Sequence, residues 1–285
     1  MIKPLGEVAP AKLNLFLRVT GRRPDGYHEI DSIFVPVSLY DKVNLELRPS
    51  QSRSVELHSS SAQIPTGEAN LAVRAARKYM DEFGVRAKVL IRLQKEIPVA
   101  AGLGGGSSDA GAVLRMLVKV CGSRNSTALN ILAARLGADV PFFLNPVPSR
   151  VRGIGEKIEP IPAMARVFAV IAVPPFEVST ASVFGELQPS HWSGPAPEEH
   201  LRAIIKGHIM PYHLVNDLES VVFAKWPRIQ RLKQLMDQLG ARASAMSGSG
   251  GSVFGLFDSA EQAFKASQEM ARHAPDVRCF AVSSL

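Results

Sequence analysis

The chain has 285 residues, of which 46% are hydrophobic and 21% are charged, a balance typical of a soluble globular protein with a buried core. No apolar run approaches the ~18 to 20 residues that a membrane-spanning helix needs, and the first residues lack the apolar stretch of a secretory signal. We therefore expect a cytoplasmic protein that does not act at a membrane.

The formal charge of +7 suits either a nucleic acid or polyanionic metabolites as partners. Lysines and arginines are scattered along the chain and no nucleic-acid-binding motif is present, so charge alone does not decide between them. Cys121 and Cys279 lack the spacing of a zinc site or a disulfide framework. We expect both to be buried free thiols.

Residues 8–19 alternate in the manner of a strand. Ala11, Leu13, Leu15, Leu17 and Val19 share one face, and Lys12, Asn14 and Phe16 share the other. This second face could be a solvated outer surface, which this segment alone favours, or it could point two polar groups into a cleft. The turn-rich residues 21–29 follow.

The remaining pattern predicts further strands and helices, mixed without a steady βαβ rhythm. Strands are expected around 43–47, 55–57, 85–93, 167–173 and 253–257, and helices around 70–83, 107–121, 126–136, 198–206, 217–239 and 260–272. Residues 186–197 are rich in proline and glycine and predict a loop. This arrangement favours an α+β fold with antiparallel sheets.

The strongest local signal is the glycine-rich run at residues 98–108. Gly102, Gly104, Gly105 and Gly106 precede Ser107 and Ser108 at a junction between a strand and a helix. Glycines let several backbone N–H groups approach an anion, and a helix N-terminus adds positive potential. The run therefore predicts a phosphate site. It is not a Walker A loop, because the lysine that should follow the glycines is missing.

Asp139 follows a helix that ends at Gly137 and has the apolar neighbours Val140, Phe142 and Phe143. A carboxylate in such a setting is costly unless it is paired or used. Phosphoryl transfer needs a proton acceptor and cations that balance spreading charge, and Asp139 and Lys12 are residues of suitable types. Their spacing in the sequence does not show that the two side chains lie together. A structural role for Asp139, as a helix cap or in a salt bridge, is an equal alternative.

Five motifs resemble a known family in content and order. They are APAKLNLFL (9–17), GRRPDGYHEI (21–30), PVAAGLGGGSSDA (98–110), GADVPFF (137–143) and MSGSGGSVF (246–254). The two glycine-rich motifs resemble GHMP kinases broadly. The first two motifs, with PPFEVSTASVF (174–184) and NDLE (216–219), are similar to the diphosphocytidyl-methylerythritol kinases within that superfamily.

The resemblance implies a two-domain GHMP kinase fold. Residues 1–160 would form a ribosomal protein S5 domain 2-like N-terminal domain with the ATP loop and the catalytic residues. Residues 161–285 would form a C-terminal α/β sandwich domain on the substrate side. The activity implied is ATP-dependent phosphorylation, with Mg²⁺, of the 2-hydroxyl of 4-(cytidine 5'-diphospho)-2-C-methyl-D-erythritol in isoprenoid precursor synthesis by the non-mevalonate pathway.

The resemblance also implies roles for individual residues. Asp139 matches the family's general base and Lys12 its electrostatic stabiliser. The ATP side comprises Pro98, Val99, Ala100, Ala101, Gly102, Leu103, Gly104, Gly105, Gly106, Ser107 and Ser108, with Asn70 and Lys95 at the adenine. The substrate side comprises Asn14, Tyr27, His28, Thr180 and Phe184, where an aromatic pair encloses the cytosine and His28 reads its edge. Magnesium is expected mainly on the nucleotide phosphates, so no protein metal ligand is assigned.

This sequence departs from the family pattern in three places. Phe184 stands where tyrosine is more usual, Ser249 replaces a threonine, and residues 145–150 (NPVPSR) interrupt a stretch that is usually richer in glycine and alanine.

Two other functions compete with the one implied: a GHMP kinase for another small alcohol, and a non-catalytic nucleic-acid-binding protein. We expect a small-molecule substrate, no nucleic acid, and a monomer or weak homodimer.

Overall fold

The computed structural model describes residues 4–122 and 126–285, which form two compact units. The first unit holds residues 4–11, 39–97, 104–122 and 126–146, and the second holds residues 12–38, 98–103 and 147–285. The chain therefore passes between the units several times. The predicted division into residues 1–160 and 161–285 stays a prediction.

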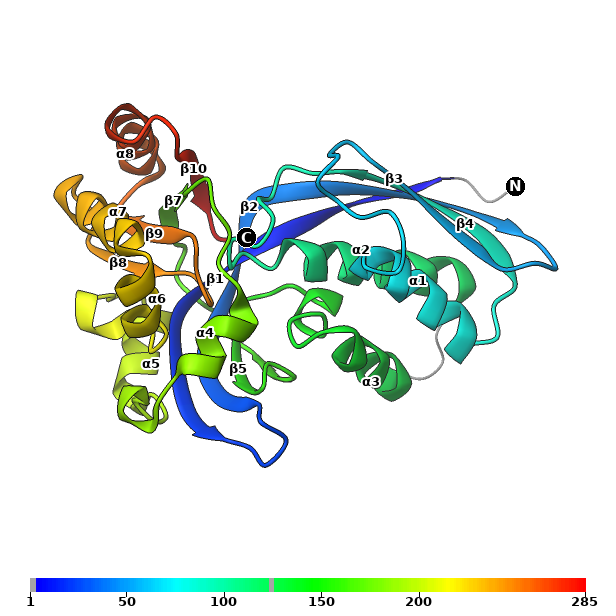
Figure 1. The fold of residues 1–285 in the computed structure, drawn as a ribbon, viewed down its shortest axis with the longest axis horizontal. Coiled ribbons are helices and arrows are strands. Elements are labelled where there is room, and N and C mark those ends of the chain that lie inside the picture. Colours follow the sequence, from blue (N-terminus) through cyan, green and yellow to red (C-terminus); the bar gives the residue numbers. More distant parts are fainter. Residues whose placement is uncertain (1–3, 123–125) are drawn as a thin grey trace. The chain divides into compact units, whose positions relative to one another are not determined.

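The first unit packs helices on one face of a sheet (Figure 1). The last part of β2 (His28–Pro49) pairs antiparallel with β4 (Ala87–Gln94), and β3 (Ser54–Ser59) pairs parallel with β4. Helices α1 (Leu71–Glu82) and α2 (Gly105–Cys121) pack on each other, and α3 (Ser126–Leu136) packs on α1. A short 3₁₀ helix, η1 (Phe142–Leu144), contacts α2. Their apolar faces form one buried core.

The second unit contains a four-stranded antiparallel sheet in the order β10-β7-β9-β8. These strands are β7 (Phe168–Val173), β8 (Ala243–Met246), β9 (Val253–Phe257) and β10 (Arg278–Ser283). The long strand β1 (Leu5–Arg22) begins in the first unit, continues in the second and pairs with β2. The first part of β2 also pairs with β5 (Ser149–Gly153), which pairs with β6 (Lys157–Pro160).

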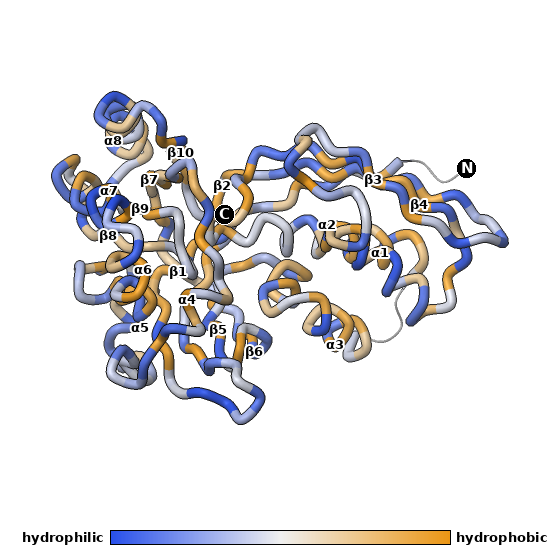
Figure 2. Tube along the Cα trace, viewed as in Figure 1, coloured by the Kyte–Doolittle hydropathy of each residue, from blue (hydrophilic) through white to orange (hydrophobic). Residues whose placement is uncertain are grey.

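Helices α7 (Pro227–Gln238) and α8 (Ala260–His273) pack on the second unit's sheet. The remaining helices of this unit are α4 (Thr180–Glu186), η2 (Pro189–His191), α5 (Glu198–Ile205), η3 (Pro211–His213) and α6 (Glu219–Lys225). Figure 2 shows the hairpin between β1 and β2 in hydrophilic colours. Within the described ranges, no helix is both long and apolar enough to cross a membrane.

The α+β fold and most predicted elements are confirmed. The helices expected at 70–83, 126–136, 198–206 and 260–272 correspond to α1, α3, α5 and α8. Asn70 caps α1 by accepting hydrogen bonds from the N–H groups of Ala72 (2.8 Å) and Val73 (3.4 Å). A buried face of alternating or helically spaced apolar side chains was enough to locate these elements.

The prediction of one helix over 217–239 is wrong. The structure has α6 and α7, which are separated at Trp226 and Pro227. Proline lacks an N–H and its ring clashes with the preceding turn, so the first helix ends there, while the fixed φ of Pro227 suits the first position of the next helix. The glycine-rich helix begins at Gly105 rather than near Ser107.

The solvated outer face predicted as the favourite for Lys12, Asn14 and Phe16 is also wrong, because these residues are 3%, 1% and 1% exposed. Both faces of β1 are covered in this part of the second unit, which periodicity alone does not reveal. The cysteines are free, but Cys121 is exposed and Cys279 only partly buried. Strands β5, β6, β8 and β10 and helix α4 were not predicted.

Candidate active site

A buried lysine lies on the polar face of β1. Lys12 donates a hydrogen bond to the side-chain oxygen of Asn14 (2.5 Å), two residues along the strand on the same face. Asn14 donates to the hydroxyl of Ser32 (3.1 Å), which in turn donates to the carbonyl of Phe16. The Lys12 ammonium also lies 4.8 Å from the ring centre of Phe34. Hydrogen bonds and a cation–π contact hold this buried cation in one place.

The first half of the glycine-rich run, residues 98–103, lies in the second unit next to Lys12. The backbone N–H of Lys12 donates to the carbonyl of Leu103 (3.0 Å). Along the run, Ala100, Gly102 and Gly104 have φ of 51°, 74° and 72°. Residues with left-handed backbone that alternate with ordinary ones turn successive N–H groups toward a common side, which is the geometry of an anion-binding nest.

The late Gly/Ser segment, residues 247–252, docks on this run. The Ser252 hydroxyl donates to the carbonyl of Ala101 (2.5 Å), and the Ser247 hydroxyl donates to that of Gly102 (3.1 Å). A Cβ built on Gly248 would lie 3.3 Å from the Lys12 ammonium nitrogen and 3.4 Å from the Asn14 side-chain oxygen. Lys12, Asn14 and the two glycine-rich segments therefore meet in one place.

Two further residues shape the late segment. Thr180, at the start of α4, shares a hydrogen bond of 2.6 Å with Ser249. Asn216 donates to the carbonyls of Met246 and Gly248, both at 2.8 Å. Sequence reasoning assigned no role to Asn216, although it begins the NDLE motif that carried part of the resemblance. Its amide satisfies two carbonyls that the turn would otherwise leave unpaired.

The second half of the run opens α2 in the first unit. Gly105, Gly106 and Ser107 form the first turn of the helix, where the backbone N–H groups have no partner within the helix. The Ser108 hydroxyl is buried and has no hydrogen-bond partner among the residues that the structure describes. A buried unpaired hydroxyl at a helix N-terminus suits a phosphate oxygen.

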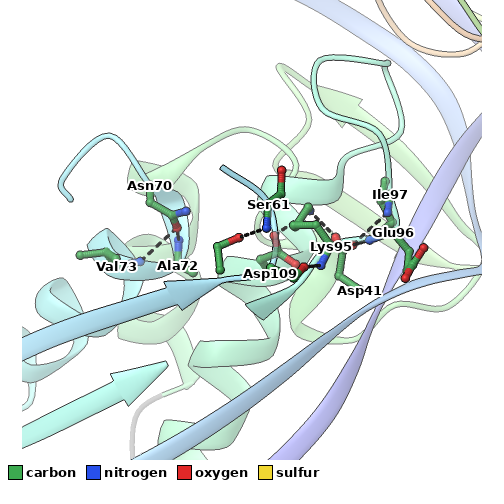
Figure 3. A network of polar contacts seen from close by, with 11 residues as sticks. Asp41, Ser61, Asn70, Ala72, Val73, Lys95, Glu96, Ile97 and Asp109 are labelled. Atoms are coloured by element: carbon green, nitrogen blue, oxygen red, sulfur yellow. Dashed lines mark hydrogen bonds and ion pairs between the residues drawn. The ribbon is translucent and has the colours of Figure 1, made fainter. Parts of the chain in front are cut away.

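A buried ion-pair network joins α2 to the strands (Figure 3). Lys95 forms ion pairs with Asp41 and with Asp109 (2.9 Å), and the other Asp41 oxygen accepts from the N–H groups of Glu96 (2.7 Å) and Ile97 (2.9 Å). Burial raises the pKa of Asp109 to about 8; the Lys95 charge opposes this shift and the Asp41 charge adds to it. Burial would lower the pKa of Lys95, but the charges of Asp109 and Asp41 raise it.

Figure 3 also shows Asn70, which sequence reasoning placed at the adenine together with Lys95. In the structure the Asn70 side-chain oxygen caps α1 and the Lys95 ammonium pairs with carboxylates. Asp41 and Asp109 were not predicted as parts of the site, since an aspartate within a strand or a helix carries no pattern of its own. The adenine contacts stay a prediction.

Asp139 lies in the turn between α3 and η1, in the first unit, and is half-buried. The neighbouring Val140, Phe142 and Phe143 are fully buried, as their apolar character predicts. Lys12 belongs to the second unit, and its pairing with Asp139 stays a prediction.

The predicted substrate residues include an aromatic cluster in the second unit. His28, at the start of β2, has its ring centre 5.5 Å from that of Phe184 on α4 and 6.0 Å from that of Trp192. Burial, with the charge of Arg22, lowers the pKa of His28. Tyr27 is 60% exposed in the hairpin. Sequence reasoning missed Trp192, which lies in the loop expected at 186–197.

Residues 70–145 match the GHMP kinase N-terminal domain and residues 201–276 match the GHMP kinase C-terminal domain. The fold is shared with a crystal structure of a homoserine kinase from Cytophaga hutchinsonii, with a TM-score of 0.73 at 18% identity over 100% of this chain and 95% of that one. The glycine-rich segments and these matches define an ATP-dependent small-molecule kinase of the GHMP class.

More similar proteins narrow the class. A 4-diphosphocytidyl-2-C-methyl-D-erythritol kinase of Syntrophotalea carbinolica is 38% identical, over 96% of this chain and 97% of its own length. One of Symbiobacterium thermophilum is 43% identical, over 86% and 88%. A crystal structure of a 4-(cytidine 5'-diphospho)-2C-methyl-D-erythritol kinase matches with a TM-score of 0.83 and 38% identity over 98% of both chains. The chain belongs to the 4-diphosphocytidyl-2-C-methyl-D-erythritol kinase family.

Proposed function

We propose that this kinase transfers the γ-phosphoryl group of ATP to the 2-hydroxyl of 4-(cytidine 5'-diphospho)-2-C-methyl-D-erythritol. The names of its relatives support this substrate. The structural observation that carries the proposal is the buried Lys12, which Asn14 holds where the two glycine-rich segments meet. Isoprenoid precursor synthesis in the cytoplasm, by a monomer or weak homodimer, is the corresponding biological role.

In the proposed reaction, Asp139 accepts the proton of the substrate hydroxyl as its oxygen bonds to the γ-phosphorus. The bond from that phosphorus to the oxygen bridging the β- and γ-phosphates breaks, and ADP leaves. Lys12 balances the negative charge that spreads over the transferring group. A correctly placed base and a fixed cation are what this type of transfer asks of a protein.

The glycine-rich run would bind the nucleotide. The N–H groups of residues 98–106 would contact phosphate oxygens, with the hydroxyls of Ser107 and Ser108, and Asn70 and Lys95 would line the adenine side. Mg²⁺, when bound to the phosphates, would neutralise part of their charge. Among the described residues no cluster of three or more His, Cys, Asp or Glu could hold a metal ion. The Ser108 hydroxyl, which is unpaired among these residues, is a protein oxygen that could contact a phosphate-bound Mg²⁺.

On the substrate side, Tyr27 and Phe184 would enclose the cytosine, His28 would read its edge, and Asn14 and Thr180 would contact the methylerythritol part. Stacking on aromatic rings contributes about 1 to 3 kcal/mol per base. That binding energy would position the reacting hydroxyl beside Asp139.

The test is ADP release with ATP, Mg²⁺ and a panel of alcohols: the cytidylyl substrate, its uridylyl analogue, free methylerythritol 4-phosphate, homoserine and mevalonate. We expect kcat/KM for the cytidylyl substrate to exceed all others by at least a hundredfold. Equal rates across the panel, or a preference for homoserine or mevalonate, would assign the chain to a different GHMP kinase activity.

A further inference from the structure

Three buried polar side chains on β1 and β2 form one chain of hydrogen bonds. Lys12 donates to the Asn14 side-chain oxygen (2.5 Å), the Asn14 amide donates to the Ser32 hydroxyl (3.1 Å), and that hydroxyl donates to the backbone carbonyl of Phe16. Lys12, Asn14 and Ser32 are 3%, 1% and 0% exposed, and all four residues belong to the second unit. The proposed reaction gives roles to Lys12 and Asn14 and none to Ser32.

The lysine fixes the direction of this chain. An ammonium group only donates hydrogen bonds, so the amide atom that faces Lys12 is the oxygen of Asn14. The amide nitrogen then faces Ser32 and, as a donor, requires that hydroxyl to accept. The hydroxyl hydrogen is thereby directed to the carbonyl of Phe16. The chain of donors therefore ends on a backbone acceptor whose position the strand sets.

Ser32 contributes an anchor from a second strand. The four-carbon stem of a lysine is flexible, and Asn14 follows Lys12 by two residues on β1. Ser32 lies on β2, which pairs with β1. In a buried setting, each donor in such a chain also polarises and strengthens the next bond. Loss of the Ser32 hydroxyl would leave a buried amide hydrogen of Asn14 without this acceptor, and the amide would shift away from its present position.

We propose that Ser32 is a positioning residue for phosphoryl transfer, whose hydroxyl fixes the Asn14 amide and thereby holds the Lys12 ammonium where negative charge develops. This inference rests on the proposed function, since it takes Lys12 as the group that stabilises the transferring phosphoryl group. Ser32 is fully buried and acts through Asn14 rather than on a substrate. A fixed charge stabilises a transition state only where it is correctly placed, and a misplacement of about 1 Å can cost about 100-fold in rate.

The first test is Ser32→Ala, which removes the hydroxyl. We expect kcat to fall at least tenfold and the KM for ATP to stay within threefold of wild type. Ser149→Ala is the matched control, because Ser149 is also 0% exposed, lies on β5 beside β2, and donates its hydroxyl to the carbonyl of Val147 (2.8 Å). Its kcat should stay within threefold of wild type. Equal values of kcat for the two variants would overturn the proposal.

Two further substitutions separate the lost hydrogen bond from a packing defect. Ser32→Thr keeps the hydroxyl and should keep kcat within threefold of wild type. Ser32→Cys fills nearly the same space with a thiol that is a weak donor and acceptor, and should be at least tenfold slower than wild type. Wild-type turnover of Ser32→Cys would overturn the proposal, whether or not Ser32→Ala folds.

A double-mutant cycle distinguishes positioning from a general structural role. If Ser32 acts through Asn14, Ser32→Ala should lower kcat less than threefold in an Asn14→Ala background, because the amide that it positions is absent. A loss of the same size in both backgrounds would overturn the proposal.

A measurement on the ligand-free protein judges the chain of hydrogen bonds independently of turnover. The NMR signal of the Asn14 side-chain amide is identified by its absence in Asn14→Asp. We expect its hydrogens to exchange with solvent at least tenfold faster in Ser32→Ala than in wild type, and at the wild-type rate in Ser149→Ala. Unchanged exchange in Ser32→Ala would overturn the proposal even if the cytidylyl substrate is phosphorylated. Failure of the wild-type protein to phosphorylate that substrate, with exchange dependent on Ser32, would instead refute the proposed function.

Discussion

Lys12 is a buried cation that its neighbours hold in a fixed position. Its side chain is 3% exposed, and the partner at 2.5 Å is the neutral amide oxygen of Asn14. Burying a cation costs several kcal/mol unless hydrogen bonds and charges compensate. A lysine buried beside two glycine-rich segments is a candidate for electrostatic catalysis.

Asp139 leads to the first prediction. Asp139→Asn keeps the size of the side chain and removes its ability to accept a proton, so kcat should fall by about 10² to 10⁴-fold while ATP affinity changes less than threefold. Asp81→Asn, which alters a surface carboxylate paired with Arg53 at 3.0 Å, is the control and should retain wild-type kcat. Steady-state kinetics and calorimetry measure the two quantities. Turnover of Asp139→Asn within threefold of wild type would exclude it as the base.

At the scale of elements, the close approach of two backbone segments depends on a glycine. Gly102 has a φ of +74°, and a Cβ there would overlap the carbonyl oxygen of Ser247 and lie 2.9 Å from that of Gly250. The positive φ would strain the backbone of any other residue, and the two carbonyl oxygens leave no space for a side chain.

Gly102→Ala should therefore disturb the phosphate run. Gly240 provides a matched control, because its φ is +87° but an added Cβ would meet nothing within 4 Å. Gly240→Ala carries only the cost of the left-handed backbone, about 1 to 2 kcal/mol. We expect Gly102→Ala to unfold at a temperature several degrees below Gly240→Ala and to raise the KM for ATP at least tenfold. Identical melting temperatures and KM values for the two variants would contradict the docking of the two segments.

The Lys95 network connects β2 and α2 through charge. One ammonium faces two buried carboxylates, Asp41 on β2 and Asp109 on α2. One Asp109 oxygen has no partner within residues 4–122 and 126–285. With all three groups ionised, a buried net charge of −1 would remain. A proton on Asp109 removes that charge, which agrees with its pKa of about 8.

This network makes stability depend on pH. In the unfolded chain Asp109 loses its proton near pH 4, whereas the folded protein retains it up to about pH 8. The folded state binds more protons in between, so stability falls as pH rises through this range, by at most about 1.4 kcal/mol per pH unit. Asp109→Asn resembles the protonated form and should lose this slope. Melting temperatures at pH 6.5, 7.5 and 8.5 test this, and parallel curves for wild type and Asp109→Asn would contradict it.

At the scale of the whole molecule, the formal charge of +7 sets a positive field around an enzyme whose proposed substrates are both polyanions. Such a field raises local substrate concentration and is screened by salt. Raising NaCl from 50 to 400 mM should therefore increase KM for both substrates several-fold and leave kcat within twofold. Sucrose at matched viscosity is the control. Salt-independent kcat/KM would show that the net charge does not assist capture.

Much of this protein was predictable from local pattern. The helices α1, α3, α5 and α8 follow from apolar side chains at helical spacing, and the phosphate run follows from glycines before a helix. Pro227 could have divided the predicted helix over 217–239, since proline disrupts a helix interior, but the apolar spacing on both sides of it suggested continuity. The short strands β5, β6 and β8 lack enough residues to show a period.

The sequence by itself determined the class of protein, because motif order and glycine placement are local properties that survive without coordinates. Only the tertiary structure decided which polar residues are buried together. Lys12 meets residues 247–252, Lys95 meets Asp41 and Asp109, and His28 meets Trp192. The physical reason is that these contacts join residues far apart in the chain, whose proximity depends on how sheets and loops pack and leaves no period in the sequence.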